Sequence, residues 1–344
     1  MKWYVVGDKR LSPFSWFLGG RGIGKTFSAI DFVLHPEEYG HPELAGGKFL
    51  YLRNTDKQIE LSKKEKGNPF KKYNAKKGTL LKIEGKSDEI AEITNIIIDE
   101  EGKEQKIQVG YAAGLSVVGN VRGIDFSDVK IIIFDEFNQR KKLTFNQFTE
   151  FYDFYETANR NREFEEPPEP PIYVLFLSNT QHLNNALLAG FNLITPIEQT
   201  IKAGQYTWRR YPHSVYLCDA PEIAEQKKKT VLYMATEGTK QYREAIENEF
   251  ANDSFYNIKK QNLNEFIGVT AIDGIYIYRH KHNGNLYCTT KSFTTDMLSS
   301  ETHLALWRRN YMVSITDKFI RGRVFFENFQ IKAKIMELCK ITTT

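Results

Sequence analysis

Consecutive apolar residues, bounded by glycine or by charged residues, mark the strands of the first half of the chain. Such runs predict buried strands, because a strand covered on both faces reads as a continuous hydrophobic segment. These strands are expected at 16–18, 48–53, 130–136 and 172–177. A helix is predicted over 27–34, since the proline that follows it stops a helix.

Two further patterns lie between these strands. The stretch 80–110 alternates short apolar runs with charged turns, which predicts β-hairpins added to the core sheet. Thr144 and Gln147 have the spacing of a helix capping box. The helix that begins there carries aromatic residues at i, i+3, i+4 and i+7, which predicts a stripe packed into the core. The stripe consists of Phe148, Phe151, Tyr152 and Tyr155.

Length and patterning predict a second domain. A chain of 344 residues exceeds the size at which a single core usually splits. Strand-forming residues at 205–217 either close the first domain or bridge to the second. Apolar runs within 266–290, with the hairpin dipeptide Asn-Gly between two of them, and helical patterns at the end indicate a smaller α+β unit. We expect a first domain at 1–201, a linker at 202–230 and a second domain at 231–344.

Composition narrows the class of protein. With 41% hydrophobic and 26% charged residues, the chain has the make-up of an ordinary globular protein. No apolar run approaches the roughly 18 residues of a membrane span, and the first residues lack the apolar core of a signal peptide. These features exclude a membrane protein and argue against secretion. Cys218, Cys288 and Cys339 are far apart, so neither a disulfide framework nor a structural zinc site is expected, and a reducing cytosol fits.

The net charge is less decisive. A formal charge of +4 and a pI near 8.6 fall short of a dedicated nucleic-acid module, which argues against a monomer that coats DNA. Lysines nevertheless cluster within 63–77 and at 227–229. They either form solvated loops, as such runs usually do, or contact an anionic polymer.

One segment has the pattern G-x-x-x-x-G-K-T between a strand and a helix, the context that a phosphate-binding loop requires. Its glycines let backbone N–H groups point at phosphate oxygens, and the helix N-terminus adds its positive dipole end. Lys25 is expected to reach the β- and γ-phosphates of ATP, and the Thr26 hydroxyl to ligate Mg²⁺. A chance glycine-rich turn is the weaker alternative. The expected nucleotide-binding residues are Gly19, Gly20, Arg21, Gly22, Ile23, Gly24, Lys25, Thr26 and Asp135.

Acidic and amide side chains follow two other strands. Asp135 and Glu136 end the strand at 130–136, where the aspartate is placed to hold Mg²⁺ and the glutamate to polarise the attacking water. Kinases and GTPases seldom place glutamate directly after this aspartate, so the pair favours ATP hydrolysis. Asn179 ends the strand at 172–177 and either senses the γ-phosphate or caps the next segment; the residue alone does not decide between these.

Two arginines, Arg160 and Arg162, stand where the helix after Thr144 runs out. Arginines in a last helical turn are often dipole partners only, worth under about 1 kcal/mol each. The alternative is an arginine finger that reaches the γ-phosphate held by a neighbouring subunit. Local sequence alone favours the first interpretation.

Taken in order, these motifs resemble a known family. GGRGIGKT, FLYLRN, GNVRGIDFSDVKIIIFDEF, NRNRE and VLFLSNT are similar to motifs of the DNA-packaging ATPases of phi29-type tailed phages, over residues 14–195. The resemblance implies an α/β fold, an additional-strand (ASCE) P-loop ATPase with a mainly parallel sheet. It also implies a homomeric ring, typically pentameric, docked on the portal vertex of an empty capsid in the host cytoplasm, which pumps double-stranded DNA inward.

The resemblance also assigns residues. Lys25 and Thr26 are similar to the nucleotide and Mg²⁺ ligands, Asp135 to the metal holder and Glu136 to the catalytic base. Arg160 resembles the trans-acting finger, and Arg162, two residues further on, is the alternative. Two other arginines, Arg53 and Arg122, resemble basic positions of the family without a firm role. Whether a structural packaging RNA takes part is left open.

Related terminases carry an RNase H-like nuclease in the C-terminal part, which needs a cluster of acids to hold two metals. Thr270 stands where the first aspartate of that site is normally found, and Asp273 lies in the turn that follows. The other acids, Asp296, Asp317 and Glu327, are scattered without a motif. We therefore predict an RNase H-like fold without nuclease activity.

The resulting prediction is a DNA-packaging motor subunit that uses ATP and Mg²⁺ and grips phosphates rather than bases. Binding to double-stranded DNA is then sequence-independent and sensitive to salt. Two other functions compete with it, a translocase of the conjugation or chromosome type and a P-loop regulator of assembly that never moves DNA.

Overall fold

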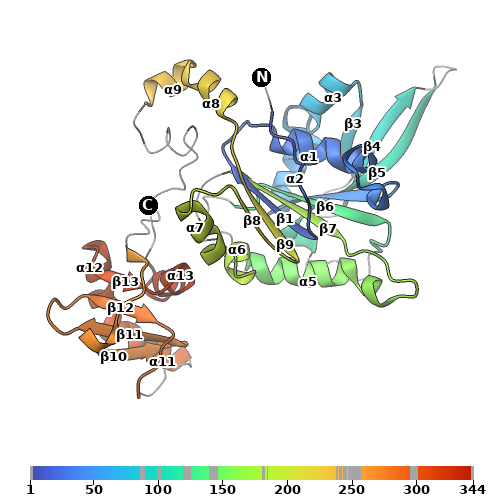
Figure 1. Cartoon of the computed structure of the whole chain (residues 1–344). Coiled ribbons are helices and arrows are strands. Elements are labelled where there is room, and N and C mark those ends of the chain that lie inside the picture. Colours follow the sequence, from blue (N-terminus) through green and yellow to red (C-terminus); the bar gives the residue numbers. More distant parts are fainter. Residues whose placement is uncertain are drawn as a thin grey trace. The chain divides into compact units, whose positions relative to one another are not determined.

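The computed structural model contains two compact units, Met1–His182 with Gln199–Ala251 and Leu183–Glu198 with Asn252–Thr344 (Figure 1). The structure describes residues 3–85, 90–98, 103–118, 125–138, 146–179, 183, 185–237, 239, 242, 246, 257–294 and 301–341. In this part of the chain, no helix combines the length and the apolar character that crossing a bilayer requires.

The first unit is built on a nine-stranded sheet with the order β3-β4-β5-β2-β6-β7-β1-β9-β8. From β5 to β9 in this order the strands run parallel, whereas β3, β4 and β8 pair antiparallel with their neighbours. The strands are β1 (Phe14–Gly19), β2 (Lys48–Arg53), β3 (Leu81–Glu84), β4 (Ala91–Ile98), β5 (Glu104–Gly114), β6 (Val129–Asp135), β7 (Tyr173–Asn179), β8 (Thr207–Arg210) and β9 (His213–Cys218).

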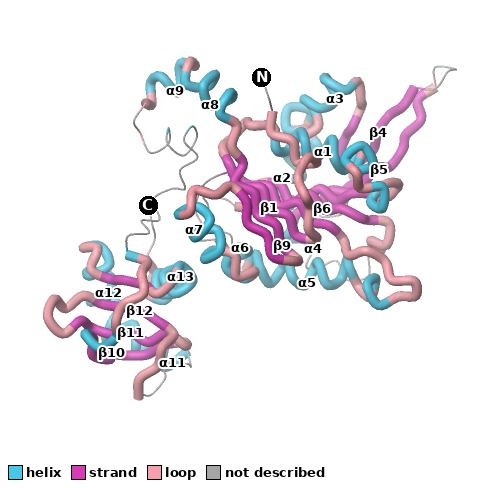
Figure 2. The backbone as a smooth tube through the Cα atoms, in the orientation of Figure 1, coloured by secondary structure: helices cyan, strands magenta, loops and turns pink. Residues whose placement is uncertain are grey.

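Helices cover the sheet because the central strands are apolar toward both faces (Figure 2). On one face, Phe17 of β1 belongs to the same core as Ile30 of α1. On the other face, the rings of Trp16 and Phe176 stack at 3.7 Å, and Phe151 of α5 lies 5.2 Å from Phe176. The helices of this unit are α1 (Lys25–Leu34), α2 (Asp56–Lys63), α3 (Lys71–Lys77), α4 (Leu115–Val118), α5 (Gln147–Asn159), α8 (Pro221–Lys228) and α9 (Val231–Ala235). The second unit contains α6 (Ala186–Gly190), and α7 (Ile194–Lys202) spans the division between the two units at residue 199.

The strand order identifies the class of P-loop fold. Strand β7 lies between β1, which leads into the phosphate loop, and β6, which ends at Asp135. This is the additional strand that the resemblance implies, and the α/β fold with a mainly parallel sheet is confirmed. The hairpins predicted over 80–110 are confirmed as well, because β3, β4 and β5 form an antiparallel meander that joins the sheet at β2.

The structure departs from the predicted pattern in two places. The cap of α5 is Asn146, whose side chain accepts hydrogen bonds from two backbone N–H groups of the first turn; Thr144 lies outside the described residues. Tyr152 of the predicted stripe is 53% exposed, and Phe154 is buried instead. The linker predicted at 202–230 is wrong for residues 207–218, which form β8 and β9 of the large sheet.

The second unit has a four-stranded sheet of order β10-β11-β12-β13, with β13 parallel to β12 and the other pairs antiparallel. Its core is formed around Trp307, Cys288 and Ile335, which are fully buried. The likeness of this unit to RNase H stays a prediction. Its elements are β10 (Phe266–Ile272), β11 (Ile275–His280), β12 (Leu286–Thr289), β13 (Val324–Phe326), α11 (Glu301–Trp307), the π-helix η7 (Arg308–Met312), α12 (Val313–Ile320) and α13 (Phe329–Leu338).

Candidate nucleotide-binding and hydrolysis site

The phosphate loop joins β1 to α1, and two of its glycines have no substitute. A Cβ on Gly19 would lie 2.3 Å from the carbonyl oxygen of Cys218 in the neighbouring strand β9. Gly24 has a φ of 101°, a left-handed conformation that strains any residue with a side chain. The sequence therefore folds the loop so that its backbone faces the start of α1, where a phosphate group binds.

Lys25 is the first residue of α1 and is 7% exposed. Its Nζ donates hydrogen bonds to the carbonyl oxygens of Gly19 at 2.9 Å and Gly20 at 2.7 Å. Burial lowers the pKa of Lys25 to about 8. The loop thus holds an ammonium group that is poorly solvated and ready to exchange carbonyl partners for phosphate oxygens.

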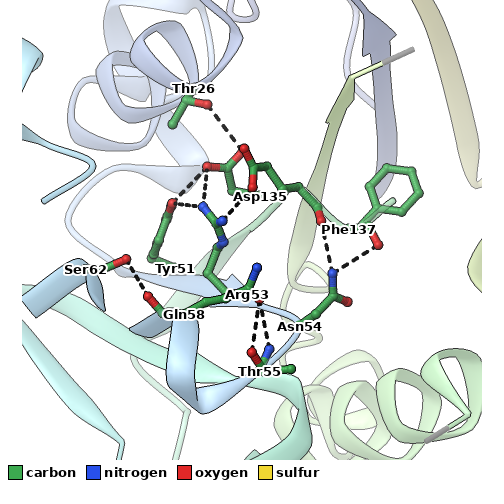
Figure 3. A network of polar contacts seen from close by, with 10 residues as sticks. Thr26, Tyr51, Arg53, Asn54, Thr55, Gln58, Ser62, Asp135 and Phe137 are labelled. Carbon is green, nitrogen blue, oxygen red and sulfur yellow. Dashed lines mark hydrogen bonds and ion pairs between the residues drawn. The ribbon is translucent and has the colours of Figure 1, made fainter. Parts of the chain in front are cut away.

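Thr26 and Asp135 meet across the site (Figure 3). The Thr26 hydroxyl donates to Oδ1 of Asp135 at 3.3 Å, and the Tyr51 hydroxyl donates to Oδ2 at 2.8 Å. A hydroxyl and a carboxylate beside a phosphate-binding loop are the ligands that Mg²⁺ takes together with nucleotide phosphates. The residues present therefore fit the metal that the sequence predicts at Thr26 and Asp135.

Glu136 is held by Arg53, which stands at the end of β2. Nη2 of Arg53 lies 2.6 Å from Oε2 of Glu136, and Nη1 lies 3.4 Å from Oδ2 of Asp135. Although burial opposes its charge, the surrounding Tyr51, Asp135 and Glu136 hold the pKa of Arg53 above its usual value. The predicted base and the predicted metal holder thus share one arginine, 16% exposed, to which sequence analysis assigned no firm role.

The backbone after Asp135 is fixed by an amide network that sequence analysis missed (Figure 3). Asn54 is fully buried, and its Nδ2 donates to the carbonyl oxygens of Glu136 at 3.0 Å and Phe137 at 3.1 Å. Nε2 of Gln147, in the first turn of α5, donates to the same Phe137 oxygen at 2.6 Å. Glu136 is kept at a φ of 51°, and the network supports this strained backbone. The only signal for Asn54 in the sequence is its place at the end of a strand.

A pocket of about 920 Å³ joins most of the predicted site residues, a volume suited to a small-molecule ligand. Asn179 reaches this pocket because it ends β7 in register with Gly19 of β1. The pocket also contains residues that no motif marked, such as Trp3 and three lysines of α3. Predicted residues in its lining are Arg21, Gly22, Ile23, Gly24, Lys25, Thr26, Asp135, Glu136 and Asn179.

The two arginines after α5 differ in surroundings. Arg162 is 7% exposed, and its Nη2 donates to the carbonyl oxygen of Ser127 at 2.7 Å, while its Nε lies 3.6 Å from a carboxylate oxygen of Glu169. Its guanidinium is therefore occupied within its own subunit. Arg160 is exposed and caps α5 with a φ of 39°. Arg122 lies outside the described residues.

The lysine-rich stretches do not form uniformly solvated loops. Nζ of Lys77 lies 2.8 Å from a carboxylate oxygen of Asp31. In the second stretch, Lys227 donates a hydrogen bond to the carbonyl oxygen of Arg21 in the phosphate loop, and burial lowers its pKa. Both stretches therefore place a lysine beside the nucleotide pocket.

Comparison with known proteins places these features in a family. A family model described as Podovirus DNA encapsidation protein (Gp16) matches residues 7–343. The DNA packaging protein of Bacillus phage B103 is 23% identical, covering 91% of this chain and 92% of that protein. A chain of the bacteriophage Phi-29 viral genome packaging motor assembly has a TM-score of 0.59 at 18% identity, covering 95% of this chain and 94% of that one. A chain of the Phi-28 DNA packaging motor has a TM-score of 0.57 at 19% identity, covering 97% of this chain and 96% of that one.

Proposed function

Since the chain belongs to the Podovirus DNA encapsidation protein (Gp16) family, and is therefore a phage DNA packaging protein, we propose that it is the ATP-hydrolysing subunit of the packaging motor. The observation that carries this proposal is the meeting of Lys25, Thr26, Asp135 and Glu136 in one pocket at the end of β1 and β6. All four residues line this pocket. Together they supply a cation for the phosphates, ligands for Mg²⁺ and a base for the attacking water, the groups that ATP hydrolysis needs.

The proposed reaction is attack of water on the γ-phosphorus of ATP. Glu136 accepts a proton from the water while the water oxygen forms a bond to the γ-phosphorus. The bond between the γ-phosphorus and the bridging oxygen of the β-phosphate breaks, and ADP leaves. Lys25 neutralises negative charge on the β- and γ-phosphates. Because Oε2 of Glu136 is bound to Arg53, that oxygen must be released before it takes the proton. Asn179, at the pocket wall, is proposed to contact the γ-phosphate or the water.

Thr26 and Asp135 are the residues that would hold Mg²⁺. When bound, this ion neutralises charge on the phosphate oxygens. The chain's own contribution is to keep the two side chains together, and the Tyr51 hydroxyl fixes the orientation of the carboxylate.

We propose that the active site is completed by Arg160 of a neighbouring subunit in a homomeric ring, which we take to be a pentamer. Arg160 is exposed at the C-terminal end of α5, whereas Arg162 is 7% exposed. The Phi-29 relative is described as a packaging motor assembly, which supports an oligomer. A finger of this kind contributes about 10³–10⁵ in rate where it is known.

The proposed substrate for movement is double-stranded DNA, held through its phosphates and without sequence preference. The motor would act in the host cytoplasm, at the portal vertex of a preformed capsid. The family description, DNA encapsidation, supports packaging over conjugation or a purely regulatory role. A packaging RNA as a further partner stays a prediction.

The second unit is proposed to lack nuclease activity. Thr270 stands on β10 where an acid is needed, and Asp273 in the next turn is bound to Lys334 at 2.8 Å. Glu327 accepts hydrogen bonds from threonines, and Asp317 is bound to Arg321, the residue that directly follows its helix. Asp296 lies outside the described residues. Incubation of the protein with plasmid DNA and Mg²⁺ or Mn²⁺ tests this, and cleavage that a chelator abolishes would contradict it.

The test of the motor is steady-state ATP hydrolysis against protein concentration, with and without double-stranded DNA. Turnover is expected to rise faster than linearly with protein and to be stimulated by DNA. Glu136→Gln is expected to bind ATP without hydrolysing it. Mixing Glu136→Gln with Arg160→Ala subunits is expected to restore some activity, because one kind supplies the finger and the other the base. No rescue at any ratio would refute Arg160, and linear turnover indifferent to DNA would refute the autonomous motor.

A further inference from the structure

Helix α3 is the most basic helix of the first unit, and it borders the nucleotide pocket. Lys72, Lys76 and Lys77 line this pocket together with the phosphate loop, on the side of Phe27 and Asp31 of α1. The same lysines belong to the stretch that the sequence associates with an anionic polymer. Their location indicates another anionic partner, the nucleotide itself.

A buried aspartate fixes α3 against α1. Asp31 is 9% exposed and accepts hydrogen bonds from the hydroxyls of Tyr39 at 2.7 Å and Tyr73 at 3.0 Å. Nζ of Lys77 completes the cluster at 2.8 Å from Oδ1 of Asp31. Because Tyr73 and Lys77 both belong to α3, this carboxylate holds the basic helix on the same helix that begins at Lys25.

Lys76 is held close to the phosphate loop by an aromatic ring. Its Nζ lies 5.2 Å from the ring centroid of Phe27, the residue that directly follows Thr26. The ring of Tyr73 lies 5.2 Å from the ring of Phe27 and supports it. The ammonium group of Lys76 therefore stands beside the pocket while its stem packs on the wall.

The charges of the pocket leave these lysines unbalanced. Asp31 is paired with Lys77, while Asp135 and Glu136 are paired with Arg53. In the described part of the chain, neither Lys72 nor Lys76 has a carboxylate partner. Together with the ammonium group of the phosphate loop, they give the pocket an excess of positive charge, which a polyphosphate balances.

We propose that Lys72 and Lys76 bind the phosphates of the nucleotide within their own subunit. The proposal deepens the proposed function and rests on it. Lys64 and Lys66 of the same stretch are exposed and do not line the pocket, so they are left to contact DNA. The basic stretch is thus divided between two anionic ligands.

The experiment compares Lys72→Met and Lys76→Met with a matched control on the same helix. Lys71→Met is that control, because Lys71 is 60% exposed, lies 3.8 Å from Glu65 and is absent from the pocket lining. The full-length variants are titrated with a fluorescent ATP analogue, and with a double-stranded DNA fragment at saturating ATP. Lys72→Met and Lys76→Met are expected to weaken ATP binding roughly tenfold each, the effect of losing one charged hydrogen bond. Lys71→Met is expected to change it less than about twofold, and Lys72→Arg to retain it.

Unchanged ATP affinity in both pocket variants overturns the proposal, and reduced DNA affinity in them then assigns these lysines to DNA. Equal losses in Lys71→Met and Lys72→Met also overturn it, because they indicate a general effect of charge. Failure of the unmodified protein to bind ATP refutes the proposed function itself. ATP binding by the unmodified protein therefore distinguishes failure of the lysine proposal from failure of the proposed function.

Discussion

The depressed pKa of Lys25 predicts that ATP binding weakens in mildly alkaline solution. Burial lowers this pKa to about 8, against 10.5 for an exposed lysine. Asp135 and Glu136 act in the opposite direction, while Lys227, which faces the loop from α8, adds to the depression. Since only the ammonium form attracts phosphate oxygens, ATP affinity falls as the pH rises through the pKa of the empty site.

The size of the effect follows from the fraction of Lys25 that is protonated. If only the protonated form binds, a pKa of about 8 makes the apparent Kd at pH 9.5 roughly 25 times that at pH 7.5. A lysine titrating at its ordinary value changes the apparent Kd by only about a tenth over the same interval. The phosphates of ATP are fully ionised throughout this range, so they contribute no slope.

Isothermal titration calorimetry at half-unit pH steps measures both the Kd and the proton uptake that accompanies binding. Uptake is expected to approach one proton per ATP above pH 8.5, because phosphate restores the charge of Lys25. Lys227→Met is the control, since burial also lowers the pKa of Lys227. Because it removes a cation near Lys25, it is expected to move the slope to higher pH without abolishing it. A Kd that stays constant from pH 7.5 to 9.5 in the unmodified protein refutes the reasoning, and complete loss of proton uptake in Lys227→Met shows that Lys227 is the titrating lysine.

Four further predictions concern other residues of the first unit. Arg53→Met removes the charged hydrogen bond, worth about 1.5–3 kcal/mol, that Oε2 of Glu136 must break before it takes a proton. Basal ATP hydrolysis without DNA is therefore expected to rise at least fivefold, and an unchanged basal rate contradicts this. Arg162→Ala is expected to lower the free energy of unfolding by about 1–3 kcal/mol, since it removes a charged hydrogen bond to the carbonyl oxygen of Ser127 and a buried side chain. Arg160→Ala is expected to change the free energy of unfolding by less than about 0.5 kcal/mol and to abolish ATP hydrolysis in the ring. Urea denaturation measures the first effect and an ATPase assay the second. A stable but inactive Arg162→Ala beside a destabilised Arg160→Ala would assign the finger to Arg162. Burial raises the pKa of Asp31, but its lysine and tyrosine partners hold that pKa below the usual value. The stabilisation that the Asp31 carboxylate gives is therefore present at neutral pH and is lost as the pH falls through the folded-state pKa. Asp31→Asn is expected to lower the free energy of unfolding by about 1–3 kcal/mol at pH 7 and by less at pH 3, and equal losses at both pH values contradict this.

The parts of the site that depend on local backbone chemistry were predictable from the sequence. The glycines of the phosphate loop, Lys25 and Thr26 are constrained by a turn of fixed length between one strand and one helix. Strand β2 was predicted with its observed bounds, 48–53, because its apolar run ends at charged residues. In each case the determining residues lie within a few positions of one another.

Contacts between distant segments could not be predicted in this way. The pairing of Arg53 with Glu136 joins residues far apart in sequence, and it depends on β2 being the neighbour of β6 in the sheet. Lys77 was predicted as part of a charged run, but Asp31 partners it only once α3 has packed against α1. The linker boundary failed for the same reason, because nothing local in 207–218 reveals that β9 pairs with β1.

The pairing of β9 with β1 determines where this chain can be cut. Phe14–Gly19 is parallel to β7 on one side and to β9 on the other, with each residue in register up to Gly19 and Cys218. A protein shortened to end at residue 201 would leave the strand that carries the phosphate loop at the rim of the sheet, with unpaired N–H and C=O groups along its length. Such a fragment would be prone to aggregate, and its nucleotide loop would lose the wall against which Gly19 packs. The smallest soluble fragment that binds nucleotide is therefore expected to extend beyond Cys218, and its recovery in monomeric form compared with the shorter fragment measures how much the last two strands contribute.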